Sequence, residues 1–575
     1  MARTASMEPN AGRTNGAPDH RDLSAPLDVL LTEATYSPRQ RFIAPDATLR
    51  LGISLARRPR QVARRVAGLA RELGRVVAGG AAITPPRGDR RFSDPAWKEN
   101  PLFRRLMQGY LATGEALDGL IGDAELDVQT VRRVRFPVEN LRDALAPSNF
   151  PWSNPAAINA AVSTRGTSLV RGARQLASDM RTPPRLPSMV DTSGFELGKN
   201  VAATPGAVIE REDAFELIQY APQTDEVRSV PLLVVPPMIN KYYIADISPG
   251  RSLVEHLVQQ GHQVFTISWR NPEAEHGSWG LDTYAEAILS ALDAAHSVSG
   301  SEQAHMLAFC GGGIGAACVA GHLAAKGERD RLAGLTLGVC VLDNEQAGTP
   351  SAFVNRDVAR LALAASARRG YLDGRALAEM FAWLRPNDLI WSYVINNYLL
   401  GRRPPAFDIL FWNQDTVRLA AGLHRDFIQI ALDNPLVEPG ALELLGTPID
   451  LSAVSVDSYV VAGIADHITP WENCQRTTRM LGGDVRFALS TSGHIAAIVN
   501  PPGNEKASYR IAEGDDHADP QAWLRRTDKH PGSWWEDWNA WLAERSGPMR
   551  DAPSRLGNGK LKPRGRAPGT YVLAT

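Results

Sequence analysis

The chain of 575 residues contains only four cysteines and carries almost no net charge. The cysteines show no metal-ligand spacing, and so few thiols in so long a chain predict reduced side chains rather than a disulfide framework. The formal net charge is −1, so the chain as a whole has no field that would attract nucleic acid or an anionic membrane. We therefore expect no metal site and no nucleic-acid partner.

Long apolar runs and targeting signals are missing as well. No apolar run approaches the ~20 residues that span a bilayer, so no transmembrane segment is expected. Residues 1–22 are polar, rich in glycine, proline, asparagine and arginine, and lack a signal-peptide core, which predicts a disordered segment and favours a cytoplasmic protein. The sequence has no Walker or dinucleotide-binding fingerprint, so it indicates no nucleotide cofactor of that kind.

What is present is the composition of a large globular protein. Hydrophobic residues make up 44% of the chain and charged residues 22%, and the length could hold several domains. Helical patterns dominate as far as a proline-rich linker at 183–187, which predicts an α-helical N-terminal domain over 23–195. The helices expected there cover 51–77, 90–120, 131–145 and 155–180.

The most informative stretch is Ala308-Phe309-Cys310-Gly311-Gly312. An apolar run over 303–309 leads into it and a helix of small residues over 313–323 follows, which predicts a strand, a sharp turn and a helix. This is the nucleophile-elbow pattern of α/β-hydrolases, with cysteine in place of the usual serine and Ala308 in place of the first glycine. The turn lifts its central side chain to the top of the sheet, so Cys310 is the candidate nucleophile, and a buried structural cysteine is the alternative.

Two further candidates follow in the order that hydrolases of this fold use. Asp466 and His494 each come shortly after an expected strand. The carboxyl ends of parallel strands open onto one shared crevice, so we expect Cys310, Asp466 and His494 to meet there. Asp343 also follows a strand and remains the alternative acid.

Strands alternate with helices from about residue 201. This alternation predicts βαβ units and a parallel sheet, here an α/β-hydrolase catalytic domain over 196–575. It stops between 344 and 445, where the chain is mostly helical and rich in aromatic residues, and we expect this insertion to form a mobile cap over the active site. The expected strands lie at 208–219, 231–235, 263–268, 303–309, 332–342, 458–463 and 485–489.

The helix expected over 51–77 is strongly basic, because arginines interleave with leucine, valine and alanine along it. Two interpretations stay open: a solvated face of an ordinary helix, or an amphipathic helix that binds a surface. Its arginines are Arg57, Arg58, Arg60, Arg64, Arg65, Arg71 and Arg75.

Several other motifs, taken together and in order, resemble those of the polyhydroxyalkanoate (PHA) synthases over residues 90–575. They are Phe92-Ser93-Asp94-Pro95-Ala96-Trp97, Pro236-Pro237-Met238-Ile239-Asn240-Lys241-Tyr242-Tyr243, Ser268-Trp269-Arg270-Asn271-Pro272, Asn387-Asp388-Leu389-Ile390-Trp391, Phe411-Trp412-Asn413, Asp466-His467-Ile468, Ser492-Gly493-His494-Ile495 and Asn500-Pro501-Pro502-Gly503. The resemblance implies a polymerase that joins (R)-3-hydroxyacyl units from coenzyme A thioesters, with coenzyme A as part of substrate and product and no other cofactor. It maps the family's nucleophile, acid and histidine onto Cys310, Asp466 and His494.

The resemblance also implies partners and a location. A homodimer that associates through the cap is expected, at the surface of polyester granules in the cytoplasm, in contact with the growing chain and with granule-associated proteins. Some strings resemble the single-subunit synthases of medium-chain-length monomers (class II), while the short-chain single-subunit class (class I) stays open. These strings are Trp279-Gly280-Leu281-Asp282-Thr283-Tyr284, Phe381-Ala382-Trp383-Leu384-Arg385-Pro386 and Asn396-Asn397-Tyr398-Leu399-Leu400-Gly401.

The chemistry of these residue types fits acyl transfer. A thiolate attacks a thioester far more readily than an alcohol does, so cysteine suits an enzyme that hands an acyl chain back and forth. His494 is the expected base for Cys310. Asp466 would either hold the imidazole tautomer or help His494 deprotonate the 3-hydroxyl of the incoming monomer, and the sequence leaves both roles open.

Oxyanion donors are expected at the N–H of Gly311 and at that of Met238 or Ile239, because the two prolines before Met238 have no N–H. Side chains that would border the substrate, if they are not ordinary core or scaffold residues, are Asn240, Tyr242, Trp391 and Trp412. Structural roles are expected for His305, Cys318, His467 and Cys474, and Asp415 is either a cap residue near the site or structural.

Two other functions remain in competition. One is a hydrolase of the same fold, such as a thioesterase, a lipase or an intracellular polyester depolymerase. The other is a non-catalytic granule-binding protein, which the basic helix and the aromatic C-terminal region suggest. The cysteine nucleophile and the long cap favour the polymerase, and an intact set of nucleophile, acid and histidine argues against the binding protein.

Overall fold

The computed structural model describes residues 31, 42, 45–86, 88–181, 183–345, 356–466, 468–512 and 519–575. The disorder expected of residues 1–22 and the structural role expected of His467 lie outside these described residues.

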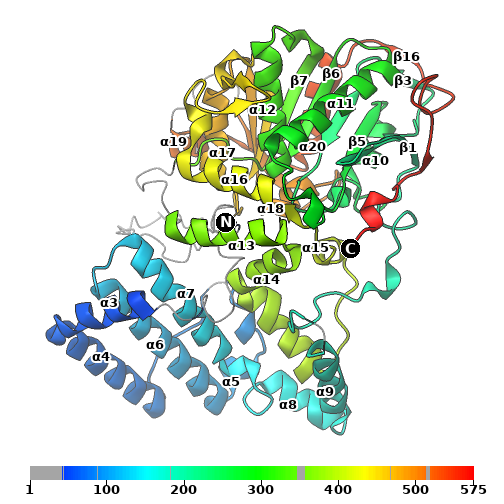
Figure 1. The fold of residues 1–575 in the computed structure, drawn as a ribbon. Coiled ribbons are helices and arrows are strands. Elements are labelled where there is room, and N and C mark those ends of the chain that lie inside the picture. The colour runs from blue at the N-terminus through cyan, green and yellow to red at the C-terminus, as the bar shows by residue number, and fades with distance from the viewer. Residues whose placement is uncertain are drawn as a thin grey trace, which may run out of the picture.

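A mixed sheet of eleven strands forms the centre of the molecule (Figure 1). Its strand order is β15-β14-β13-β12-β7-β6-β4-β5-β2-β1-β17. The six strands from β13 to β5 are parallel, and the strands beyond them at both edges pair antiparallel. The strands are β1 (Gly206–Arg211), β2 (Phe215–Tyr220), β4 (Leu232–Val235), β5 (Val264–Trp269), β6 (Ala304–Phe309), β7 (Leu332–Gly338), β12 (Ser458–Gly463), β13 (Val485–Ser490), β14 (Ser508–Ile511), β15 (Lys529–Pro531) and β17 (Gly565–Arg566).

The parallel strands read as short continuous apolar runs because both faces of the sheet are covered. Every residue of β4, β6 and β12 is buried. One face packs against α11 (Leu281–Ser299) and α12 (Gly311–Ala325), and the other against α10 (Leu253–Gln259) and the tryptophan-rich α20 (Trp534–Arg545). The predicted parallel sheet is therefore present, as the central part of a larger mixed sheet.

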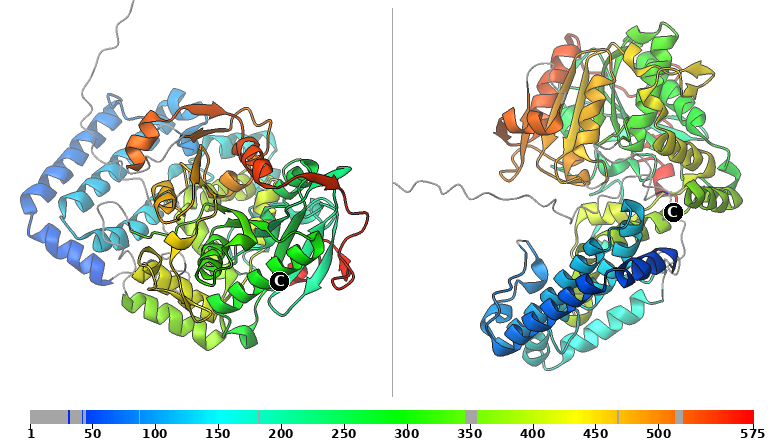
Figure 2. Two further views of the ribbon diagram at one scale, coloured as in Figure 1. Left: turned by 90° about the horizontal axis from the view of Figure 1, so that it is seen from above. Right: turned by 90° about the vertical axis from the view of Figure 1, so that its left-hand side faces the viewer.

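The helices before the sheet form a separate layer below it, as the blue and cyan ribbon in Figures 1 and 2 shows. They are α3 (Pro45–Ala56), α4 (Pro59–Ala78), α5 (Ala96–Glu99), α6 (Pro101–Asp123), α7 (Val128–Ala144), α8 (Pro155–Ser163) and α9 (Thr167–Asp179). The single helix expected over 51–77 is broken before Pro59, whose ring clashes with the carbonyl four residues earlier in a continuing helix. The helix expected over 155–180 is broken at Gly166, which adopts φ +81°.

The basic helix α4 packs along α6, and two arginines, one at its start and one along it, pair with acidic side chains at the protein surface. Arg58 pairs with Glu125, and Arg65 makes two hydrogen bonds to the carboxylate of Asp123. Other arginines of this helix face solvent. The solvated-face interpretation therefore accounts for part of its basic character, and the paired arginines fix the helix to its neighbour.

The insertion between β7 and β12 is mostly helical within its described residues, with two small two-stranded sheets. Its helices are α13 (Arg356–Arg369), α14 (Gly374–Leu384), α15 (Asp408–Gln414) and α16 (Ala421–Asp433), with two π-helical segments at Asn387–Trp391 and Val394–Leu399. The second π-helical segment contacts α9, and the hydroxyl of Tyr398 donates to Asp179 at 2.8 Å. The insertion thus links the N-terminal helices to the sheet.

The C-terminal residues contain two short strands. β16 (Met549–Asp551) pairs with β3 (Glu226–Arg228), and β17 extends the main sheet beside β1. Each of these pairings joins segments more than 300 residues apart, which local composition cannot reveal. Within the described part of the chain, none of the helices combines the length and the apolar character that crossing a bilayer requires.

Candidate active site

Cys310 lies at the turn between β6 and α12, with φ 51° and ψ −125°. This is a strained conformation for a residue with a side chain, and the surrounding structure holds it: the N–H of Cys310 donates to the carbonyl of Gly338 at 3.0 Å. A Cβ on Gly312 would lie 2.3 Å from the carbonyl oxygen of Pro236, so only glycine fits there. The strand, turn and helix predicted around position 310 are all present.

His494 and Asp466 lie beside this turn. His494 is the first residue of α18 (His494–Ile498), after β13, and Asp466 follows the end of β12. Nδ1 of His494 is 2.7 Å from Oδ2 of Asp466, and the thiol of Cys310 is close enough to contribute to the raised pKa of His494. The structure therefore brings together the three residues that the sequence puts forward as nucleophile, base and acid, and all three are buried.

The charges in this cluster stabilise one another. Burial lowers the pKa of His494, but the carboxylate of Asp466 and hydrogen bonds to Asp466 and Cys310 outweigh it and raise the pKa to about 10. Burial acts to raise the pKa of Asp466, but His494 and hydrogen bonds from Thr469 hold it below its ordinary value. Asp466 therefore stays ionised and can stabilise an imidazolium that forms when His494 takes a proton.

Thr469 is a polar contact of this cluster that no sequence motif indicates. Its hydroxyl donates to Oδ2 of Asp466 and lies 3.1 Å from Nδ1 of His494. Its only signal in the sequence is its place three residues after Asp466.

The residues proposed for the oxyanion site surround the elbow. Gly311 is the first residue of α12, where a backbone N–H has no acceptor within the helix. Met238 and Ile239 follow the end of β4, and a Cβ on Gly315 would lie 2.7 Å from the terminal methyl of Met238, so this loop packs on the first turns of α12. Phe427 of α16 covers the elbow from the cap side, since its ring lies 3.1 Å from the place of a Cβ on Gly311.

The four side chains proposed to border the substrate are spread over the junction of cap and sheet. Asn240 forms an isolated antiparallel bridge with Thr416. Trp412 is buried and its indole N–H donates to the carbonyl of Lys241 at 2.8 Å. Tyr242 is buried in the core on the side of α10, and Trp391 is half-buried in the first π-helical segment. Tyr242 and Trp412 belong to the same buried apolar cluster as Cys310.

The alternative acid lies in a different environment. Asp343 accepts a hydrogen bond from Asn434 at 2.9 Å and lies 3.4 Å from Arg476. Neither contact involves His494. Asp415 accepts from the hydroxyl of Tyr243 at 2.9 Å, which ties the cap to the loop after β4. The other side chains expected to be structural are buried: His305, Cys318 and Cys474.

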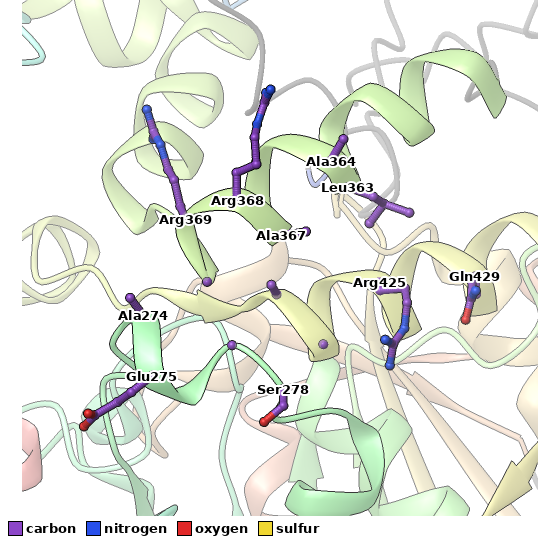
Figure 3. Close-up of a pocket in the computed structure, with 14 residues that line it drawn as sticks. Ala274, Glu275, Ser278, Leu363, Ala364, Ala367, Arg368, Arg369, Arg425 and Gln429 are labelled. Carbon is purple, nitrogen blue, oxygen red and sulfur yellow. The ribbon is translucent and has the colours of Figure 1, made fainter.

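A cavity of about 680 Å³ lies between α13, α16 and residues 274–278. Arg425 and Gln429 line it from α16 and are each two residues from Phe427, so the cavity lies on the opposite side of this helix from the elbow. Figure 3 shows that Arg368 and Arg369 point away from Arg425, and these basic side chains do not converge on a common point. The cavity is thus separated from Cys310 by α16.

Comparison with known families and proteins agrees with this architecture. Residues 88–257 match the family model described as "Poly-beta-hydroxybutyrate polymerase (PhaC) N-terminus", and residues 236–501 match the "alpha/beta hydrolase fold". The predicted α/β-hydrolase core, with its helical insertion and the helices that precede it, is thereby confirmed.

Curated relatives match nearly the whole chain. Two proteins of Ectopseudomonas oleovorans, "Poly(3-hydroxyalkanoate) polymerase 1" and "Poly(3-hydroxyalkanoate) polymerase 2", are each 46% identical, covering 90% of this chain and 92% of theirs. The "Poly(3-hydroxyalkanoate) polymerase subunit PhaC" of Cupriavidus necator is 41% identical, covering 87% of this chain and 85% of its own. Identity of this extent confirms the resemblance to PHA synthases, and the chain belongs to the poly(3-hydroxyalkanoate) polymerase family.

Proposed function

We propose that this protein is an acyltransferase that polymerises (R)-3-hydroxyacyl groups from coenzyme A thioesters and releases coenzyme A. The observation that carries the proposal is the cluster of Cys310, His494 and Asp466 at a strained elbow, in a chain of the polymerase family. We assign Cys310 as nucleophile, His494 as base and Asp466 as the carboxylate that orients it.

In the first step Sγ of Cys310 attacks the thioester carbonyl of the substrate. His494, which its raised pKa keeps protonated at neutral pH, already holds the proton that the thiol gives up. A carbon–sulfur bond forms at Cys310, and the bond to the sulfur of coenzyme A breaks as that sulfur receives the proton. The N–H of Gly311 and that of Met238 or Ile239 are the proposed donors to the oxyanion that develops in between.

In the second step the 3-hydroxyl oxygen of one unit attacks the thioester of another. An ester bond forms, the hydroxyl proton passes to His494, and the departing sulfur receives a proton in turn. Thioester exchange is nearly isoenergetic, so a cysteine can take and return the chain many times.

A hydrolase of the same fold would use the same cluster but admit water. Two features favour the polymerase: relatives that are polymerases over nine-tenths of the chain, and the helical cap whose Phe427 covers the elbow. A covered elbow protects an acyl-cysteine from hydrolysis.

We propose medium-chain monomers as the preferred substrates. Three strings, at 279–284, 381–386 and 396–401, resemble the class II synthases, and these support the proposal. Comparing kcat/KM for four-carbon and ten-carbon (R)-3-hydroxyacyl-coenzyme A tests it, and a preference for the four-carbon substrate would refute it.

We further propose that the enzyme works as a homodimer at the surface of cytoplasmic polyester granules, in contact with granule-associated proteins. Asn240, Tyr242, Trp391 and Trp412 are proposed to border the substrate, and coenzyme A to be the only cofactor, as part of substrate and product. Analytical ultracentrifugation with and without substrate tests the dimer, and co-sedimentation with granules tests the location.

The main experiment measures two products from purified protein and (R)-3-hydroxyacyl-coenzyme A: free thiol and precipitated polyester. Both should appear with the wild type, and neither with Cys310→Ala. Cys318→Ala is the matched control, because Cys318 is a buried thiol on α12 that should leave both products unchanged. Release of free hydroxy acid without polymer would identify a hydrolase instead.

A further inference from the structure

Thr469 is buried between the proposed acid and the proposed base. Its side chain is beside both: Oγ1 donates to Oδ2 of Asp466 and lies 3.1 Å from Nδ1 of His494. No element of the polymerisation chemistry described above requires a hydroxyl at this position. Its contacts therefore call for a separate explanation.

The carboxylate of Asp466 has about four acceptor positions, two on each oxygen. Oδ1 accepts from the backbone N–H of Ile468 at 2.8 Å and from that of Thr469 at 3.0 Å. Oδ2 accepts from the hydroxyl of Thr469 and from Nδ1–H of His494 at 2.7 Å. Donors of the protein itself thus occupy all four positions, and Thr469 supplies two of them.

A carboxylate in this state cannot also accept a proton from a substrate hydroxyl unless one of these donors leaves. Holding the imidazole is compatible with the four hydrogen bonds, and so is helping His494 deprotonate the 3-hydroxyl through that imidazole. Direct contact of Asp466 with the 3-hydroxyl is not. Because Nδ1 of His494 is held by Asp466, Nε2 is the nitrogen that remains for proton transfer.

We propose that Thr469 is a positioning residue that fills the last acceptor position of Asp466 and so leaves His494 as the only base for both steps. The proton of the Cys310 thiol passes to Nε2 of His494 and from there to the departing sulfur of coenzyme A. In the second step the proton of the 3-hydroxyl takes the same path to the departing thiol. The inference rests on the proposed polymerase function. It assigns proton transfer to His494 and the orientation of the imidazole to Asp466.

The test separates the two steps with two substrates. An acyl-coenzyme A without a 3-hydroxyl can acylate Cys310 but cannot extend a chain, so its single-turnover release of coenzyme A reports the first step alone. Steady-state release from (R)-3-hydroxyacyl-coenzyme A, with polymer formed, reports both steps. Because Thr469 acts through His494, Thr469→Val should slow both rates by the same factor, about tenfold, with KM nearly unchanged. Thr469→Ser restores the hydroxyl and should restore both rates to within about twofold.

Thr477→Val is the matched control. Thr477 is also buried, and its hydroxyl has no hydrogen-bond partner among the described residues, so this variant should keep both rates. If Thr469→Val fails to fold by circular dichroism, Thr469→Ala removes the same hydroxyl with less crowding and the comparison is repeated with it.

Two results would overturn the inference. Slowing of the polymer-forming reaction alone, with normal acylation, would mean that Asp466 itself acts on the 3-hydroxyl. A folded variant with both rates unchanged would mean that Thr469 only packs. Failure of the polymerase proposal gives a different result, because the wild-type protein would then form no polymer. Release of coenzyme A from the acyl-coenzyme A without a 3-hydroxyl would still report how Thr469 affects His494.

Discussion

Nζ of Lys241 lies 3.7 Å from Oδ1 of Asp415, at the point where the cap, the loop after β4 and the end of the chain meet. The Lys241 side chain is only 2% exposed, and its ammonium donates to the carbonyls of Val572 and Ala574. The other oxygen of Asp415 accepts from Tyr243. One buried lysine thus fixes three segments around the loop that carries the proposed oxyanion donors.

Replacing Lys241 by methionine should destabilise the protein and slow catalysis. The change removes the donor to two C-terminal carbonyls and leaves the carboxylate of Asp415, 19% exposed, without its cation. We expect the free energy of unfolding to fall by about 2 kcal/mol. Urea unfolding measures this loss. In Lys241→Met/Asp415→Asn the uncompensated charge is gone, and the double variant should be more stable than the single one. Equal stability of the two variants would contradict the coupling.

Gly312→Ala should abolish most activity. The new Cβ would lie 2.3 Å from the carbonyl oxygen of Pro236 and 2.8 Å from that of Val235, so α12 and the end of β4 must move apart. That movement displaces the N–H of Gly311 from the proposed oxyanion site, and losing one such donor lowers kcat by about a hundredfold or more. Ala308→Gly is the control at the same elbow, because it restores the usual glycine of the motif and should keep kcat within about twofold. Glycine in a strand should lower the free energy of unfolding by about 0.5–1 kcal/mol. Normal kcat in Gly312→Ala would refute the assignment.

Local pattern was sufficient to predict the elements that position the site. The strand expected at 458–463 matches β12, and the elbow needs only a short apolar run, small residues and a helix, which are all contiguous in sequence. The position of Asp466 and the family resemblance favoured it as the acid, and Asp343 stayed an alternative because it also follows a strand. Distances decide between the two: Asp466 contacts His494 and Asp343 contacts Arg476.

Contacts between distant segments were beyond prediction. Three contacts depend on how separate elements pack: Phe427 with the elbow, the hydroxyl of Thr469 with His494, and Lys241 with the carbonyl of Val572. The same reason explains the missed strands β14 to β17, which are short and polar. β14, β15 and β17 become strands by extending the main sheet, and β16 does so by pairing with β3.

The pair of His494 and Asp466 should make stability depend on pH in a defined window. The pKa of His494 is raised to about 10 from an unfolded value of about 6.5, so its contribution is complete below about pH 6.5 and is lost as the pH rises towards 10. The pKa of Asp466 is lowered, so its contribution is present above about pH 4 and is lost as the pH falls through the lowered pKa. The free energy of unfolding lost in His494→Gln should therefore be largest between about pH 4 and 6.5. A loss that grows between pH 7 and 10 would contradict the ion pair.

Gly172→Ala should detach the N-terminal helices from the cap. A Cβ on Gly172 of α9 would lie 1.8 Å from the carbonyl oxygen of Tyr398, which is backbone and cannot turn aside, so the two helical segments must separate. We expect the free energy of unfolding to fall by about 2–3 kcal/mol, at the upper end of the cost of overpacking. Hydrogen exchange in the segment Val394–Leu399 should become faster. Gly68→Ala is the control, because Gly68 lies inside α4 with nothing within 4 Å of a Cβ, and alanine should stabilise that helix by about 0.5–1 kcal/mol. If both variants shift the unfolding free energy in the same direction, the close crossing of α9 and the cap does not hold the two parts together.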